Sequence, residues 1–226
     1  MTMRGLTVSE RWYRTMLKEN LFFLSEFLRE FKTTGACFPT SRWAAQALIA
    51  PLNASNRGGK HILELGPGTG SVTVPLIQNM KEGDTLTICE INPRFMKALK
   101  DKLTEHPDFD RVKHQVTFFQ GPAQEIPEDK RFDIIVCALP FLNFDLTTVQ
   151  EIFAKLRRIS SPETLMTYYE FIGLRKMGQT VSHPERRKRI SEVSDFMEQN
   201  LENKLNRERI WLNVLPINVY TIKPAA

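Results

Sequence analysis

Three glycines at alternate positions, Gly66, Gly68 and Gly70, follow a short apolar stretch and precede a segment with helical spacing. Glycines let the chain turn tightly and let a ligand come close to the backbone. In dinucleotide enzymes such a loop places a pyrophosphate at the start of a helix. Here Glu64 stands just before the loop, and a carboxylate at its mouth would repel a pyrophosphate. The loop is better suited to a cationic ligand that carries an amino group.

A second carboxylate, Glu90, ends the next predicted strand, twenty residues after Gly70. A carboxylate at that place can accept hydrogen bonds from both hydroxyl groups of a ribose. Taken alone, Glu90 is most simply an exposed acid at the end of a strand. Together with the glycine loop at the end of the preceding strand, it favours a binding role. A ligand with a ribose, an amino group and positive charge matches S-adenosylmethionine.

The loop from Glu64 to Gly70 resembles the glycine-rich motif of class I methyltransferases. The resemblance implies that S-adenosylmethionine is the cofactor. These enzymes often carry Gly-Asp-Ala after the third strand, and this chain has Pro122 in place of the Asp. We therefore expect the N–H of Ala123 to face the adenine ring and Gln124 or Glu125 to contact its amino group, with a plain turn as the alternative.

The end of the fourth predicted strand, 132–138, should face the methyl group, because ligands of open α/β sheets lie beyond the carboxyl ends of the strands. The strand continues into Leu139, Pro140 and Phe141, and we place Leu139 among the cofactor contacts. Methyltransferases of nucleic-acid adenines carry a polar side chain at the position of Ala138. An adenine amino group would lack that acceptor here.

This strand end instead resembles the bacterial phospholipid N-methyltransferases, which carry Gly-Leu-Pro followed by Phe or Leu. The resemblance extends to the segment from Gly35 to Ser41, to the glycine loop and, near the C-terminus, to the spacing of Trp211, Asn213, Pro216 and Val219. It covers most of the chain in order. It implies transfer of methyl groups to the amino group of phosphatidylethanolamine, and to its mono- and dimethyl forms, towards phosphatidylcholine.

The resemblance also assigns roles to residues on the substrate side. Ser41 and Asn143 are expected near the phospholipid, and Phe141 and Tyr168 are the candidate catalytic residues. An aliphatic amine with a pKa near that of lysine, about 10, must lose a proton before it attacks. Because no histidine lies in a motif, we expect catalysis by positioning and desolvation. The ring of Phe141 could hold the ammonium as methyl groups accumulate, with packing in the core as its alternative.

Two other functions stay open. An rRNA adenine N6-dimethyltransferase would share the fold, the cofactor and a basic surface, with nucleic acid as its partner, although Ala138 argues against it. A scaffold that binds the cofactor without turnover is the second, and intact motifs give it little support.

An anionic membrane surface is a further predicted partner. Residues 9–32 have an amphipathic helical pattern that includes Trp12, which suits packing on the domain, a position in the membrane interface, or both. Residues 173–189 carry six Lys and Arg against one Glu, Arg186 and Arg187 among them. A solvated helix start explains such a cluster. Contact with anionic lipid or with the phosphate backbone of RNA is the functional alternative.

Short β-branched runs alternate with helical spacing after residue 60, which indicates βαβ units and a mostly parallel sheet. The pattern predicts strands near 60–65, 84–91, 115–120, 132–138, 163–172, 208–213 and 216–222, and helices near 41–52, 71–81, 93–105, 146–158 and 184–205. The last two strands are too close for parallel pairing, so they should form an antiparallel hairpin at the sheet edge. We therefore predict an α/β, doubly wound, mostly parallel seven-stranded sheet after an N-terminal amphipathic helix, with residues 1–58 as a helical cap and 59–226 as the methyltransferase domain.

Composition limits the remaining classes. The chain has 226 residues, of which 42% are hydrophobic and 25% charged, which fits one folded domain. Its uncharged apolar runs are shorter than the roughly 18 residues of a spanning helix, and charges near the start predict no secretory signal. Cys37, Cys89 and Cys137 lie far apart, which argues for a reducing cytoplasm and against a metal site. We expect a monomer at the inner face of the cell membrane.

Overall fold

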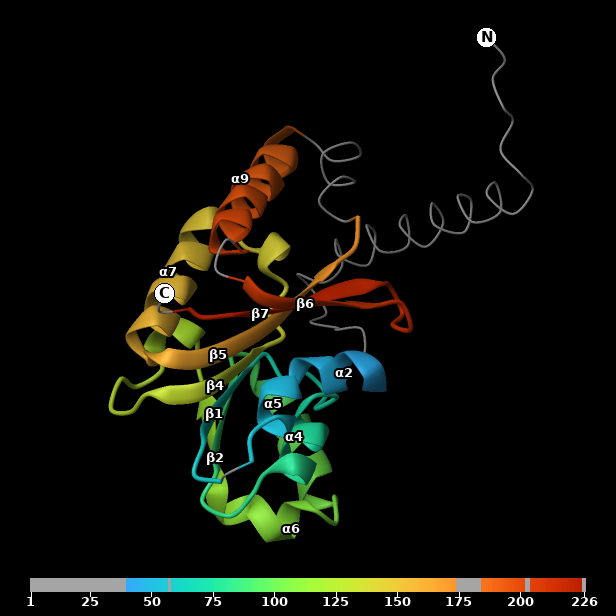
Figure 1. Ribbon diagram of the computed structural model, residues 1–226, viewed down its shortest axis with the longest axis vertical. Coiled ribbons are helices and arrows are strands. Elements are labelled where there is room, and N and C mark those ends of the chain that lie inside the picture. The colour runs from blue at the N-terminus through green and yellow to red at the C-terminus, as the bar shows by residue number, and fades with distance from the viewer. Residues whose placement is uncertain (1–39, 57, 174–183, 202–203, 225–226) are drawn as a thin grey trace, which may run out of the picture. The chain divides into compact units, whose positions relative to one another are not determined.

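A seven-stranded sheet organises the part of the chain that the computed structural model describes, residues 40–56, 58–173, 184–201 and 204–224 (Figure 1). The strand order is β3-β2-β1-β4-β5-β7-β6. The strands are β1 (His61–Leu65), β2 (Thr85–Glu90), β3 (Val116–Gln120), β4 (Phe132–Cys137), β5 (Ser160–Phe171), β6 (Lys204–Ile210) and β7 (Ile217–Ile222). The first five pair in parallel, and β7 pairs antiparallel with both β5 and β6. The predicted parallel sheet with a C-terminal antiparallel hairpin is confirmed.

Helices cover both faces of the sheet, as a doubly wound fold requires. Along β1, Ile62 faces one apolar cluster while Leu63 and Leu65 face the other. The first cluster lies under α2 (Arg42–Leu48), α3 (Ala50–Asn53), α4 (Thr73–Asn79), α5 (Pro93–Thr104) and α6 (Phe109–Val112). The second lies under α7 (Leu146–Arg158) and α9 (Pro184–Asn200), which run side by side in Figure 1. Three short 3-10 turns complete the described elements: η1 (Lys113–Gln115), η2 (Ala123–Glu125) and η3 (Phe141–Asn143).

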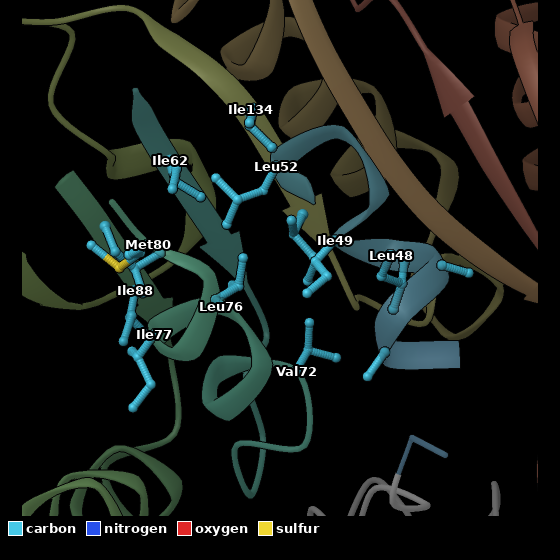
Figure 2. Close-up of a cluster of buried hydrophobic side chains, with 14 of the residues drawn as sticks. Leu48, Ile49, Leu52, Ile62, Val72, Leu76, Ile77, Met80, Ile88 and Ile134 are labelled. Carbon is cyan, nitrogen blue, oxygen red and sulfur yellow. The ribbon is translucent and has the colours of Figure 1, made fainter. Parts of the chain in front are cut away.

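The helices α2 and α3 belong to the same compact unit as the sheet. This unit extends from Phe38 to Ala226. Figure 2 shows apolar side chains of the segment that contains α2 and α3 near side chains of β1 and of the start of α4. Those of the first segment are Leu48, Ile49 and Leu52, and those they approach are Ile62, Val72 and Leu76. The proposed boundary between residues 58 and 59 therefore falls inside this unit. The amphipathic pattern of residues 9–32 lies outside the described residues.

Two predicted helices end earlier than their patterns suggest. The single helix expected at 41–52 is broken at Ile49, because Pro51 in the first turn of α3 has no N–H with which to continue α2. The helix expected at 184–205 ends at Asn200, and β6 begins at Lys204 instead of 208. Since β6 is an edge strand with every residue but Ile210 exposed, it lacks the apolar alternation that marks a half-buried strand.

None of the helices within the described ranges combines the length and the apolar character that crossing a bilayer demands.

One buried hydrogen bond joins α2 to the sheet. The hydroxyl of Thr167 on β5 donates to the carbonyl of Leu48 at 2.7 Å, and both residues are inaccessible to solvent. Replacing Thr167 by Val keeps the shape and removes the donor, so the free energy of unfolding should fall by about 1–3 kcal/mol. Urea unfolding measures this loss. The matched control is Thr147→Val on the exposed side of α7, and an equal effect of both substitutions would show that the contact contributes nothing.

Candidate active site

A pocket of about 150 Å³ opens where the carboxyl ends of β1, β2, β3 and β4 meet. In parallel α/β sheets this edge is where ligands bind. The lining consists of one carboxylate and mainly small or apolar groups: Leu65, Gly66, Cys89, Glu90, Ile91, Gly121, Pro122, Ala123, Gln124, Leu139, Phe144, Thr148 and Ile152. The structure thus brings together five predicted cofactor contacts, namely Gly66, Glu90, Ala123, Gln124 and Leu139.

The glycine loop can keep its path only with glycines. Gly66 and Gly70 have φ of 69° and 80°, a region that other residues avoid. A Cβ on Gly66 would lie 2.9 Å from Leu139 Cδ2, and one on Gly70 would lie 2.6 Å from Leu99 Cδ1. Gly66 lines the pocket directly, whereas Gly68 and Gly70 shape the loop behind it. A backbone held this close to the pocket fits a ligand that approaches the main chain.

Glu90 ends β2 with its side chain on the pocket wall and only 7% of the residue exposed. One carboxylate oxygen accepts from the backbone N–H of Asn92 at 2.8 Å, and the backbone N–H groups of Gly68 and Ile91 also point to the carboxylate. Burial raises the pKa of Glu90, and these hydrogen bonds oppose the rise. The carboxylate is therefore fixed in place by the backbone, as a group that receives two ribose hydroxyls must be.

Glu64 occupies a different place from the one that the sequence suggests. We expected it at the mouth of the loop, but it is fully buried and does not line the pocket. The two-residue repeat of β1 turns it towards the face of Ile62, away from the pocket-lining Leu65. Its Oε2 accepts from the Thr73 hydroxyl at 2.8 Å, while Oε1 has no hydrogen-bond partner among the described residues.

The environment of Glu64 favours its neutral form. Burial raises the pKa of this carboxyl to about 8; the hydrogen bond from Thr73 opposes the rise and the charge of Glu90 adds to it. A buried acid with one unsatisfied oxygen is costly unless a positive group comes near. A cationic ligand bound at the glycine loop would supply such a group.

The two candidate catalytic residues lie in the core. Phe141 is buried with its ring centroid 5.3 Å from that of Phe153 and 6.1 Å from that of Tyr168. Tyr168 is buried as well and stacks on Tyr220 at 5.4 Å. Neither lines the pocket. Their burial favours core packing over direct contact with a substrate.

The predicted substrate and membrane residues are spread over several elements. Asn143, in η3, is partly buried, and its Nδ2 has no acceptor among the described residues. Ser41 caps α2, and its backbone N–H donates to Asn213 Oδ1 at 2.9 Å. Arg186 and Arg187 lie in the first turn of α9, away from the pocket lining. Trp12 lies outside the described residues.

Sequence reasoning missed the residues that form the apolar end of the pocket. Phe144 follows η3, whose tight turn carries Phe141 into the core and leaves Phe144 on the pocket wall. Thr148 and Ile152 lie one turn apart on α7, on the face that closes the pocket. Their spacing of four residues was the available signal.

Comparison with known proteins relates this domain to methyltransferases. Residues 62–163 match the family model described as a methyltransferase domain. The chain is 21% identical over 146 residues to the ornithine lipid N-methyltransferase of Singulisphaera acidiphila, an alignment that covers 65% of this chain and 74% of that protein. It is 28% identical over 120 residues to the ubiquinone/menaquinone biosynthesis C-methyltransferase UbiE of Shewanella pealeana, which covers 53% of this chain and 45% of UbiE. The chain thus spans about half the length of the UbiE relatives.

Solved structures confirm the fold. The glycopeptide N-methyltransferase MtfA in complex with S-adenosylmethionine superposes with a TM-score of 0.58 and 16% identity, over 85% of this chain and 99% of that one. The predicted class I methyltransferase fold is therefore confirmed. The chain carries a methyltransferase domain, and its cofactor is S-adenosylmethionine.

The place of Glu90 predicts a large loss of cofactor affinity on its removal. Glu90→Ala deletes the carboxylate that would receive the ribose hydroxyls, so S-adenosylmethionine binding should weaken about 10- to 300-fold. Isothermal titration calorimetry on the folded variant measures the change. The exposed Glu105→Ala serves as the control, and unchanged affinity in Glu90→Ala would remove this residue from the site.

The raised pKa of Glu64 predicts a specific dependence of stability on pH. Between its ordinary value of 4.5 and about 8, the folded protein keeps a proton that the unfolded chain releases. The free energy of unfolding of the cofactor-free protein should therefore fall as pH rises through this window, by up to about 1.4 kcal/mol per pH unit. Glu64→Gln, which cannot titrate, should flatten this slope in urea unfolding between pH 5 and 8. Glu105→Gln should leave it unchanged, and parallel curves for wild type and Glu64→Gln would contradict the assignment.

Proposed function

We propose that this S-adenosylmethionine-dependent methyltransferase acts on the amino group of a membrane lipid, with phosphatidylethanolamine as the first candidate substrate. The observation that carries the proposal is the apolar end of the pocket. Leu139 after β4, Phe144 after η3 and Ile152 on α7 form this end. No polar side chain stands at Ala138, where an adenine amine would need an acceptor.

An apolar pocket favours the reactive form of an aliphatic amine. The amine nitrogen attacks the methyl group with its lone pair, so it must first lose a proton. Surroundings such as Leu139 and Phe144 disfavour the charged ammonium and lower the pKa of the amine. Among the described residues of the lining, the ionisable groups are Glu90, already held by backbone N–H groups, and Cys89, whose pKa burial and the charge of Glu90 raise to about 12. Desolvation and positioning, not a dedicated base, are the proposed source of catalysis.

Phe144 takes the place that the sequence had suggested for Phe141. Its ring lies on the pocket wall, where it can contact the ammonium that grows more apolar with each methyl group. Cation–π attraction needs no N–H donor. A ring at this position therefore suits repeated methylation of one nitrogen, towards phosphatidylcholine.

The relative from Singulisphaera acidiphila supports a lipid amine by its name, ornithine lipid N-methyltransferase. It also makes an ornithine lipid the second candidate substrate. Both lipids carry an aliphatic amine, which must lose a proton in an apolar environment before it attacks the methyl group. An rRNA adenine would require the acceptor that Ala138 lacks.

A transfer assay with labelled S-adenosylmethionine tests the substrate class. Vesicles that contain phosphatidylethanolamine should receive label, whereas ribosomal RNA should not; ornithine lipid vesicles test the second candidate. Label in RNA with none in either lipid would contradict the proposal.

Phe144→Leu tests the role of the aromatic ring. It keeps most of the apolar volume and removes the π face, worth about 2 kcal/mol at a desolvated site. Transfer to phosphatidylethanolamine at saturating S-adenosylmethionine should fall about 30-fold, most strongly for the later methyl groups. Because Phe144 lines the same pocket as the predicted cofactor contacts, cofactor affinity is measured in parallel, and a fall in rate that weaker cofactor binding explains would contradict a contact with the substrate. Phe118→Leu, a partly buried ring on β3 outside the pocket lining, is the matched control. Equal rates in both variants would exclude a ring contact.

A further inference from the structure

The tip of the β6–β7 hairpin lies at the same edge of the sheet as the cofactor pocket. Ile217, the first residue of β7, pairs with Phe171 at the carboxyl end of β5. The backbone N–H of Ile172 then donates to the carbonyl of Pro216 at 2.8 Å. Because β5 is parallel to β4 and β1, its carboxyl end shares the edge on which the pocket opens.

Large apolar side chains project into solvent at this tip and at the start of α2. Trp211, Leu212 and Val214 are 58%, 63% and 58% exposed, and Trp43 on α2 is 44% exposed. We call these four residues the apolar rim. In Figure 1 the hairpin tip lies beside the first turn of α2.

The rim is a built surface because Asn213 joins its two parts. The side-chain oxygen of Asn213 accepts from the backbone N–H of Ser41, and its Nδ2 donates to the carbonyl of Leu215 at 3.0 Å. The hairpin tip is thus bound both to itself and to the cap of α2. These two hydrogen bonds are partly buried and hold the exposed tryptophans in place. Exposed apolar groups lower solubility, a cost that binding to a partner would offset.

Within the two segments that carry the rim the charged residues are arginines, while Glu208 on β6 lies directly before the second segment. Residues 40–44 and 209–216 contain two arginines and no acidic residue. The Arg42 guanidinium carbon lies 4.2 Å from the centroid of the Trp43 ring, and that of Arg209 lies 5.5 Å from the Trp211 ring. Paired tryptophan and arginine side chains suit the boundary between acyl chains and anionic headgroups.

We infer that the apolar rim is the surface by which this enzyme rests on an anionic lipid bilayer, with the edge of the sheet that opens to the cofactor pocket turned towards the lipid. The inference deepens the proposed function and rests on it. Four side chains are far fewer than the roughly 20–30 residues per partner of a stable protein interface. Two arginines are also a weak match for a nucleic-acid backbone, whose binding relies on many cations.

Sedimentation with phosphatidylglycerol vesicles tests the rim. The variant Trp43→Ser, Trp211→Ser, Leu212→Ser should bind these vesicles about tenfold more weakly or worse than wild type. Leu205→Ser removes an equally exposed leucine, 57% accessible, from the far end of β6 and should bind as wild type does. Arg42→Gln with Arg209→Gln should weaken binding mainly at low salt. Unchanged vesicle binding by the triple variant overturns the inference.

Stability and mass measurements exclude the other occupants of this surface. Thermal unfolding and calorimetric S-adenosylmethionine affinity of the triple variant should match wild type. A lowered melting temperature would show that the rim packs against the chain itself, and a change from dimer to monomer in light scattering would show a contact between copies. Either result overturns the inference.

Methyl transfer to short-chain phosphatidylethanolamine dispersed as single molecules separates this inference from the proposed function. The triple variant should methylate the dispersed lipid as wild type does and fail on vesicles. If wild type binds vesicles through the rim and methylates no lipid amine in either form, the proposed function fails and the docking surface stands. If both proteins methylate vesicles equally, the rim has no role and the proposed function stands.

Discussion

Two backbone hydrogen bonds at the carboxyl end of β1 hold the site together. The N–H of Gly66 donates to the carbonyl of Cys89 at 3.0 Å, and the N–H of Ala138 donates to the carbonyl of Leu65 at 2.9 Å. They extend the parallel ladders of β1 with β2 and β4 by one step beyond the regular strands. The glycine loop, the carboxylate of Glu90 and the side chain of Leu139 therefore meet around one pocket. A slip of one residue in either ladder would turn these groups to the opposite face of the sheet.

The strands that are buried on both faces of the sheet could be predicted from the sequence. The central strands β1, β2 and β4 appear as short apolar runs between helical patterns, because each is covered on both sides. The edge strand β6 could not be placed correctly, since its exposed and charged residues carry no period. Pro51 indicated a break between α2 and α3. The prediction of a single helix followed the apolar pattern of residues 41–52 instead.

The site could be predicted where backbone geometry dictates residue type, and less well where side-chain direction matters. Gly66 is marked in the sequence by glycines before a helix, and Glu90 by its place as an acid at the end of a strand. Which of Phe141 and Phe144 reaches the pocket depends on the turn that η3 makes between them. The burial of Glu64 follows from the two-residue repeat of β1, but its depth depends on α4 and on Thr73, which the sequence alone does not position.

Among the described residues, the surfaces proposed to meet the substrate are mainly apolar. The pocket ends in Leu139, Phe144 and Ile152, and the same edge of the sheet carries the apolar rim. Recognition by desolvation selects for a class of molecule, not for one headgroup. The same arrangement would therefore accept amines of several lipids and discriminate among them weakly.

Because β7 is antiparallel to β5, it runs from the hairpin tip to the opposite edge of the sheet. Ile222 pairs with Met166 near the amino end of the parallel ladder, opposite the hairpin tip. A fluorescent label or a surface tether joined at Lys223 would thus stand a full strand length from the pocket and the rim. Immobilised by that end, the protein would present its ligand-binding edge to the solution.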